Sequence, residues 1–492
     1  MSPAAPNDSR RRWMVLILLS AAQFVVVLDA SIVNVALPSI GSALHFSQEN
    51  LQWVVSAYVL VFGGFLLLGG RLADLLGRRL VFMTGLLIFA LASLAGGLAT
   101  SEGFLIGARA VQGLGGALLS PAALSIVTTT FTEGAERNRA LGIWGAVAGS
   151  AGAVGVLLGG ILTDTVGWEW VFFVNTPICL GAAALTPGLI RESRMTGAVR
   201  RFDVLGAVSV TAGLTTFVYA LVDANNSGWG STKIVVLFVA AAALLALFVV
   251  VELRSKAPLV PFRIFRLRTV LGSNVSGVLI GASLFSMFFF VSLYMQQVLR
   301  YSPLKAGFSY LPLALAIIVS AGIASQLVTR VGFKRVLIFG MTLVVAGLVW
   351  FSQISVDGGF LSDVLGPSLL AGAGLGFAFV PVTIGAVTGV RDSDAGLASG
   401  LINTSQQVGG ALGLAVLSTI ATSRIDSLMT TAHGARGALP NALTEGFQSA
   451  FLAGAGFALL GVLAAAVLIR GDSVAQAEAA RSHDDASIAE AA

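Results

Sequence analysis

The sequence predicts an all-helical integral membrane protein, and three observations lead to this prediction. Of the 492 residues, 56% are hydrophobic and only 11% are charged, whereas a soluble domain carries roughly 25% charged residues. About 14 apolar runs follow one another along the chain, each long enough to cross a hydrocarbon core about 30 Å thick. A short loop motif also recurs in the second half of the chain. This combination excludes a soluble fold.

Each apolar run is bounded by charged or turn-forming residues and is expected to form one spanning helix. The runs fall at 13–37, 51–71, 79–99, 103–129, 139–162, 170–190, 203–222, 232–253, 269–297, 304–328, 334–353, 364–387, 396–420 and 447–469. The first run is too long for the apolar region of a signal peptide and ends at no cleavage site, so we expect it to be retained. An even number of helices places both chain ends on one side of the membrane.

Two related loop motifs divide these helices into two sets. Residues 70–79 (GRLADLLGRR) close the second run, and a weaker version at 327–335 (LVTRVGFKR) closes the tenth, so that Gly77 aligns with Gly332 at an offset of 255. Two six-helix halves around a site at the midplane are typical of secondary transporters. The predicted organisation is a tail at 1–12, a first half at 13–190, a loop with two inserted helices and an interfacial segment at 191–268, a second half at 269–470 and a disordered tail at 471–492.

The positive charges indicate how the chain is oriented. Placing the N-terminus inside assigns most of the 29 Lys and Arg residues to cytoplasmic loops and tails, as the positive-inside rule requires. The chain is basic, with a pI of 9.7, but its net charge is only +5 and its basic residues lie in short clusters between apolar runs. This pattern predicts cytoplasmic termini and excludes a nucleic acid partner.

Several other kinds of chemistry are not expected. The sequence has no Walker-type phosphate loop, so ATP is not expected to be the energy source. Cys179 is the only cysteine and the three histidines are scattered, which leaves no disulfide framework and no metal site. We therefore expect no enzyme activity and no cofactor, and the partners are the lipid bilayer, a small solute and an ion such as the proton.

Two charged residues lie well inside apolar runs, where a charge costs several kcal/mol and marks a functional site by default. Asp29 precedes Pro38 by 9 residues, and Arg109 follows Glu102 by 7. At 1.5 Å per residue the two lie about 13 and 10 Å from the same face of the membrane, so they are expected to share one cavity. Gln112, one turn from Arg109 on the same face, could orient it.

A carboxylate that can be protonated beside a fixed guanidinium is what proton coupling requires. Asp29 would alternate between a proton and a cationic substrate, while Arg109 disfavours protonation of Asp29. The alternative interpretation is a static ion pair that ties the first helix to the fourth. The sequence leaves both interpretations open.

Three segments carry a resemblance to a known family. Residues 70–79 resemble the signature between the second and third helices of the major facilitator superfamily. Residues 28–38 (LDASIVNVALP) and 105–113 (LIGARAVQG) are similar to signatures of its 14-helix drug/proton antiporter (multidrug efflux) family. Shorter matches lie at 168–177, 301–303 and 394–400. The resemblance implies export of hydrophobic, often cationic, compounds that is driven by the proton gradient.

The resemblance also implies a conformational latch in the loop that closes the second helix. It assigns this role to Gly70, Asp74, Gly77, Arg78 and Arg79. In the family, the acidic residue lies near a helix N-terminus and holds one conformation. The alternative is a positive cluster that only orients the chain in the membrane.

Small and aromatic residues provide two further candidate features. A row of glycines lies roughly along one face of the fifth helix, and such residues allow close helix packing in lipid: Gly145, Gly149, Gly152, Gly155, Gly159 and Gly160. The antiporter signature of the family has a proline where this chain has Val156, which leaves the direction of transport open. Aromatic residues of the ninth helix could line an apolar substrate pocket, or could simply face lipid or the core: Phe285, Phe288, Phe289 and Tyr294.

The sequence therefore predicts a proton-coupled efflux transporter that works by alternating access. A proton-coupled uptake symporter is an alternative within transport, and a membrane receptor that does not transport is an alternative of another class. The Arg-, Ala- and Gly-rich composition is typical of a GC-rich bacterial genome. We therefore expect a plasma membrane location.

Overall fold

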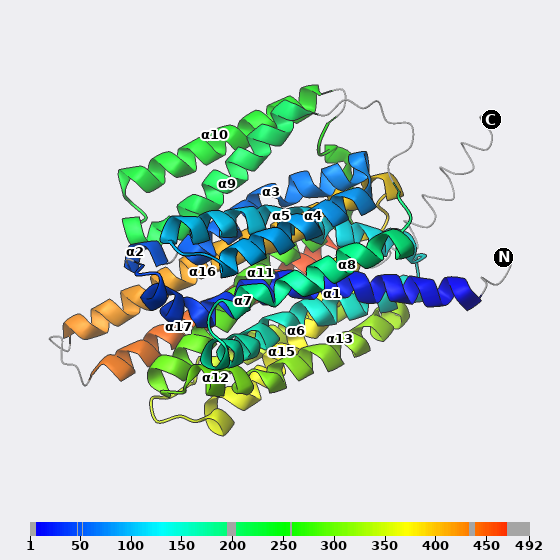
Figure 1. Ribbon diagram of the computed structural model, residues 1–492. Coiled ribbons are helices and arrows are strands. Elements are labelled where there is room, and N and C mark those ends of the chain that lie inside the picture. Colours follow the sequence, from blue (N-terminus) through cyan, green and yellow to red (C-terminus); the bar gives the residue numbers. More distant parts are fainter. Residues whose placement is uncertain are drawn as a thin grey trace, which may run out of the picture.

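The computed structural model describes residues 6–46, 48–51, 53–193, 203–255, 258–431 and 438–469. Within these ranges all regular structure is helical, and 14 helices are long and apolar enough to span a membrane. They lie side by side as one bundle (Figure 1), which confirms the predicted fold class. The predicted disordered tail at 471–492 lies outside the described residues, and residues 6–12 of the predicted N-terminal tail are helical.

The bounds of the helices follow the apolar runs closely. The first half contains α1 (Pro6–Ala43), α2 (Gln48–Leu51), α3 (Trp53–Leu76), α4 (Arg78–Gly97), α5 (Glu102–Thr130), α6 (Ala135–Thr165), α7 (Trp170–Phe173) and α8 (Asn175–Leu189). The inserted helices are α9 (Val204–Ser227) and α10 (Thr232–Arg254), followed by the short η1 (Phe262–Arg266). The second half contains α11 (Arg268–Leu293), η2 (Tyr294–Val298), α12 (Pro303–Ser309), α13 (Leu311–Val331), α14 (Phe333–Phe351), η3 (Phe360–Val364), α15 (Leu365–Val387), η4 (Asp392–Asp394), α16 (Ala395–Thr431) and α17 (Leu439–Leu468).

The two halves repeat the glycine of their loop motif at an offset of 255 residues, and they share a similar glycine contact between helices, in which Gly115 and Gly374 are 259 residues apart. Gly77 and Gly332 both take positive φ, at 122° and 82°, where α3 gives way to α4 and α13 gives way to α14. A Cβ atom added at Gly115 would lie 2.6 Å from the backbone nitrogen of Phe89, and one at Gly374 would lie 2.6 Å from that of Val344. Helices pack closely in lipid where small residues face each other. The paired contacts show that the chain repeats its packing as well as its loop motif.

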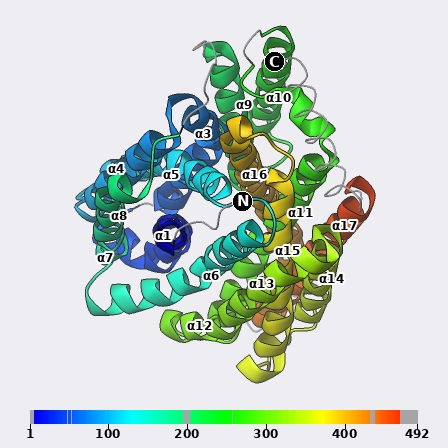
Figure 2. The ribbon, with the colours of Figure 1, turned by 90° about the vertical axis from the view of Figure 1, so that its right-hand side faces the viewer.

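The inserted pair α9–α10 lies along one side of the bundle and contacts both halves. Thr215 of α9 packs against Gly64 of α3, and the Trp229 indole nitrogen donates to Thr419 of α16 at 2.7 Å. Figure 2 shows α9 beside α3 and α16, with α6 and α13 on another side of the bundle. The inserted pair therefore covers the seam at which α3 meets α16.

We expect Gly115→Val to lower the stability of the folded protein by about 2 kcal/mol, because the added methyl groups overpack the α4–α5 contact. Gly107→Val on the same helix is the matched control, since a Cβ atom there would meet nothing within 4 Å. The loss of monodisperse protein after heating in detergent measures the difference. Equal thermal stability of the two variants would contradict the packing role of Gly115.

Candidate functional site

Asp29 of α1 and Arg109 of α5 form a direct ion pair inside the first half. Arg109 Nη1 lies 2.5 Å from Asp29 Oδ2, and both side chains are completely buried. Pro38, from which the depth of Asp29 was counted in the sequence, does not end the first helix, because α1 continues to Ala43. The two side chains nevertheless meet.

The Asp29 carboxylate is surrounded by hydrogen-bond donors. Gln112 and Asn175 each donate through their amide nitrogen to Asp29 Oδ1 at 2.8 Å. Gln112 also accepts from Arg109 Nη1 at 2.6 Å and donates to Ser93 at 2.7 Å. Since every neighbour donates, the geometry is that of an ionised carboxylate. Gln112 contacts both charges and so fixes how they face each other.

Arg109 is held from other directions as well. Its Nε donates to the Val54 carbonyl of α3 at 2.8 Å, and its guanidinium lies 4.3 Å from the centre of the Tyr58 ring. A cation over an aromatic ring is attracted by the ring quadrupole. Two buried polar atoms, Arg109 Nη2 and Asn175 Oδ1, have no hydrogen-bond partner. They are available for new partners when the helices move.

Sequence reasoning found Asp29, Arg109 and Gln112 but missed Asn175, Ser93 and Tyr58. Asn175 begins α8 directly after the short helix α7. The only indication in the sequence was that a polar amide residue occurs within the apolar stretch at the end of the 168–177 motif. Serine and tyrosine are common in spanning helices, so Ser93 and Tyr58 gave no signal.

Asp74 of α3 contacts the second half at the start of α16. Its two carboxylate oxygens accept from the backbone N–H groups of Gly396 and Leu397, each at 2.9 Å. A carboxylate is stabilised at a helix N-terminus by the free N–H groups and the helix dipole. Arg78 bonds both the Asp74 carboxylate, at 3.1 Å, and the Asp392 carbonyl. We call Asp74, Arg78 and the start of α16 the latch, and this end of the bundle the latch end.

The other residues assigned to the latch have separate places. Gly70 lies against the backbone of α16, where an added Cβ atom would be 3.1 Å from the Cα atom of Gly400. Gly77 allows the sharp turn between α3 and α4 through its positive φ. Arg79 faces away from α16 and pairs with Glu192, at 3.8 Å.

Asp394, which ends η4, links the inserted segment to the latch. It lies 3.5 Å from Arg71 of α3 and 3.7 Å from Arg263 of η1. Arg71 also donates to the Pro258 carbonyl at 3.3 Å. The segment after α10 therefore contacts the same corner as the latch, which the sequence did not indicate.

The glycines of α6 do not face a single partner. Gly142 and Gly149 face the second half, where an added Cβ atom at Gly149 would lie 2.6 Å from Ile317 of α13. Gly155 and Gly159 instead face α1, where an added Cβ atom would lie 2.8 Å from the Leu28 carbonyl oxygen and 2.7 Å from the Ile32 carbonyl oxygen, respectively. A Cβ atom added at Gly152 would meet only Phe288 of α11, at 3.9 Å, and Gly160 is buried. The row of glycines thus serves two different contacts.

The four aromatic residues of the proposed substrate pocket are dispersed. Phe285 and Phe289 are 39% and 41% exposed, and Phe288 is partly buried. Tyr294 is completely buried, and its hydroxyl donates to the Ser355 carbonyl at 2.7 Å. These four side chains line neither the groove between α6 and α13 nor the small cavity between the halves.

A small enclosed cavity of about 30 Å³ lies between the two halves. It has space for roughly one or two water molecules. Its polar lining comes from both halves: Gln23, Trp144, Thr383, Asn403 and Gln406. Ser120 of α5 donates to Gln23 at 2.8 Å, and its hydroxyl oxygen also lies 3.4 Å from Asn403 Oδ1.

We expect Asp74→Asn to weaken the contact between the halves at the latch end, because the amide loses the charge that pairs with Arg78 and the helix dipole. Spin labels at the exposed positions Leu80 and Val331, in a Cys179→Ala background, report the separation of the halves. Charge-assisted hydrogen bonds contribute about 1.5–3 kcal/mol each, so separated distances should gain at least about tenfold in population. Asp392→Asn, an exposed carboxylate at the same corner, is the control. An unchanged distance distribution in Asp74→Asn would show that the latch does not hold the halves together.

The comparisons with known proteins agree with this architecture. Residues 19–414 match the family model described as Major Facilitator Superfamily. The chain is 39% identical over 471 residues to the puromycin resistance protein pur8 of Streptomyces alboniger, covering 95% of this chain and 93% of that protein. It is 43% identical to the cephamycin export protein CmcT of Amycolatopsis lactamdurans, covering 82% and 84% of the two chains.

The fold also resembles a solved structure of low sequence similarity. The crystal structure of the human organic anion transporter MFSD10 (TETRAN) superposes with a TM-score of 0.64 at 15% identity, covering 94% of this chain and 100% of that one. The helices, the two halves and the sequence matches lead to one assignment. The chain belongs to the major facilitator superfamily and is closely related there to drug resistance and export proteins with 14 spanning helices.

Proposed function

We propose that the protein exports hydrophobic, often cationic, antibiotic-like compounds in exchange for protons, by alternating access between its two halves. The buried Asp29–Arg109 pair carries this proposal, because a carboxylate deep in a spanning bundle is a proton site that a folded protein retains only at a cost. Two relatives are described as a resistance protein and an export protein, which supports export over uptake. They also argue against a receptor that does not transport.

Protonation of Asp29 would disturb the whole cluster. A neutral carboxyl group donates a hydrogen bond, yet the groups around it, Arg109, Gln112 and Asn175, all donate to it. Protonation also leaves Arg109 as a buried charge without its partner, which costs about 3–5 kcal/mol. The cluster must rearrange, and the unpaired oxygen of Asn175 is one acceptor for the new proton. Proton uptake by Asp29 would therefore weaken the hydrogen bonds that hold α1 against its neighbouring helices.

Helix α1 would transmit this change to the substrate. Gln23, which lines the cavity between the halves, precedes Asp29 by six residues, or about 9 Å along the helix. Leu28, beside Asp29, contacts Gly155 of α6, and α6 also packs against α13 of the second half. We place the substrate site at the cavity lined by Gln23 and Asn403, which enlarges in another conformation. Asp29 and the substrate would then communicate through α1 rather than by direct contact in this conformation.

The charge distribution supports the orientation within the membrane. We propose that the latch end faces the cytoplasm, with both termini there, in the plasma membrane of a bacterium. In the state described here the halves contact each other at that end through Asp74 and through Asn138, which donates to Thr329 at 3.0 Å. The proton gradient supplies the energy, and no cofactor takes part.

Asp29→Asn should abolish export that depends on the proton gradient, because the amide keeps the size of the side chain but cannot bind and release a proton. Efflux of a fluorescent cationic dye from reconstituted vesicles with an imposed pH gradient measures it, normalised to inserted protein. We expect at least about a hundredfold loss, the scale of losing an essential proton-transfer group. Asp164→Asn, at an exposed carboxylate of α6, should transport normally. Wild-type efflux by the Asp29 variant would remove this residue from coupling.

Replacing Arg109 separates coupling from structure. Arg109→Ala removes the positive charge paired with Asp29, so the pH profile of transport should move to higher pH. Arg109→Lys keeps the charge but cannot reach Asp29, Gln112 and the Val54 carbonyl together, since it lacks the planar fork. It should retain part of the activity with a smaller shift.

The same vesicle assay, run over a range of pH and corrected for inserted protein, distinguishes a coupling role of Arg109 from a static ion pair. If Arg109 only packs the helices, both variants insert poorly and the surviving protein keeps the wild-type pH profile. That result would overturn the coupling role. Drug accumulation by cells, instead of efflux, would favour the uptake alternative while leaving the role of Asp29 intact.

A further inference from the structure

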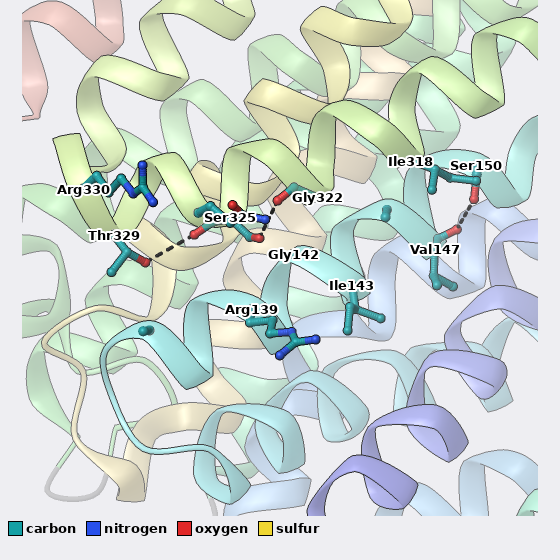
Figure 3. A pocket seen from close by; sticks show the side chains of 13 residues that line it. Arg139, Gly142, Ile143, Val147, Ser150, Ile318, Gly322, Ser325, Thr329 and Arg330 are labelled. Atoms are coloured by element: carbon teal, nitrogen blue, oxygen red, sulfur yellow. Dashed lines mark hydrogen bonds between the residues drawn. The ribbon is translucent and has the colours of Figure 1, made fainter.

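A groove of about 890 Å³ lies between α6 and α13 at the latch end, and Figure 3 shows its lining. Its volume is within the range of ligand sites, roughly 300–1,000 Å³. The groove is distinct from the proton site and from the small cavity between the halves. Its walls are formed by the stretch of α6 from Ala135 to Ser150 and by the stretch of α13 from Ile318 to Arg330.

The lining changes from charged to apolar along the groove. Figure 3 shows Arg330 near one end of the groove on the α13 wall and Arg139 on the opposite wall, next to Ile143, while Ile318 lies farther along α13. From Arg139 to Ser150 the groove follows α6 for about 16 Å. This length is about half of a hydrocarbon core roughly 30 Å thick, or one leaflet. The polarity and length together match an amphiphile that lies parallel to the helices.

The charged end is suited to an anion. No Asp or Glu lines the groove, and among the described residues neither Arg139 nor Arg330 takes part in an ion pair. Ser325 and Thr329 donate their hydroxyls to carbonyls of α13 itself. The Arg139 guanidinium lies 5.1 Å from the centre of the Trp13 ring, a contact with the ring face that uses none of its N–H groups as hydrogen-bond donors. The donors that remain for a ligand are therefore mainly the two guanidinium groups, which suit phosphate oxygens.

The groove faces lipid and not the interior of the transporter. Ile143 and Ile318 are 39% and 45% exposed. The other face of α6, with Trp144 and Ala148, lines the small cavity between the halves. A ligand in the groove would therefore come from the bilayer.

The position of the groove between the two halves also supports a ligand that comes from the bilayer. The halves meet along two seams, α3 with α16 and α6 with α13. The first seam is covered by α9, which contacts both of its helices. The groove lies on the second seam, away from the inserted pair. Helix α9 covers the first seam, whereas neither inserted helix covers the second seam, which is available to a membrane lipid.

We propose that the groove binds one glycerophospholipid with a net negative headgroup. Its phosphate lies between Arg139 and Arg330, and an acyl chain follows Ile143, Val147 and Ile318. Because α6 and α13 belong to different halves, the bound lipid bridges the halves beside the contact between Asn138 and Thr329. The proposal depends on neither the direction of transport nor the coupling role of Asp29, so its failure leaves the proposed function untouched.

Native mass spectrometry of the full-length protein in detergent tests the site directly. The protein is titrated with phosphatidylglycerol, with phosphatidylcholine and with glycerol phosphate. Two variants remove the two ends of the site: Arg139→Gln with Arg330→Gln, and Gly322→Phe. A Cβ atom at Gly322 would meet nothing within 4 Å, so phenylalanine fills the groove without disturbing the fold. Arg335→Gln, an exposed arginine at the same end that does not line the groove, is the matched control.

We expect one phosphatidylglycerol to bind more tightly than phosphatidylcholine. The double arginine variant should bind it roughly tenfold or more weakly, since each arginine attracts an anionic lipid independently. Gly322→Phe should lose binding to a similar degree, and Arg335→Gln should match the wild type. Equal binding by all variants would overturn the site. Glycerol phosphate that binds as tightly as the lipid, with no effect of Gly322→Phe, would replace the lipid with a free anion and would also overturn the proposal.

Discussion

The buried pair of Asp29 and Arg109 is the interaction on which the arrangement of the first half depends. Two charges in a spanning bundle lose their hydration, and their mutual attraction compensates only if further hydrogen bonds complete the site. Helices α1, α3, α4, α5 and α8 all contribute a group to it. The helices must therefore stand at fixed depths and rotations. In the proposed mechanism, the same requirement makes the cluster sensitive to a single proton.

The second constraint is that lipid gives no hydrophobic force between helices, so contact depends on shape. Glycines supply that shape, at Gly115 and Gly374 within the halves and at Gly70 and Gly149 between them. At the latch end the halves are also joined by polar contacts, in which Asp74 accepts from the free N–H groups at the start of α16. Polar contacts of this kind can break without exposing a large apolar surface, as the proposed alternating access requires.

Much of the fold could be predicted from the sequence, because crossing a bilayer demands long apolar runs that few other structures need. Asp29 and Arg109 were found because charges are rare in such runs, and Gln112 because it follows Arg109 by one helical turn. Asn175 was not found, and the resemblance implied a helix N-terminus near Asp74 without saying which helix, since both contacts depend on which helices meet. The glycines of α6 and the aromatic residues of α11 show the same limit. Their spacing identifies a face, but only the three-dimensional arrangement shows what that face contacts.

The inserted pair α9–α10 makes the two flanks of the transporter unlike. Rocking of the halves requires sliding along both seams, but on one flank the motion takes place beneath a helix that contacts α3 and α16 together. On the other flank no inserted helix covers the seam between α6 and α13, and the groove along that seam faces the bilayer. The two halves are related by an internal repeat, but the inserted pair makes the molecule asymmetric when it is viewed along the membrane normal.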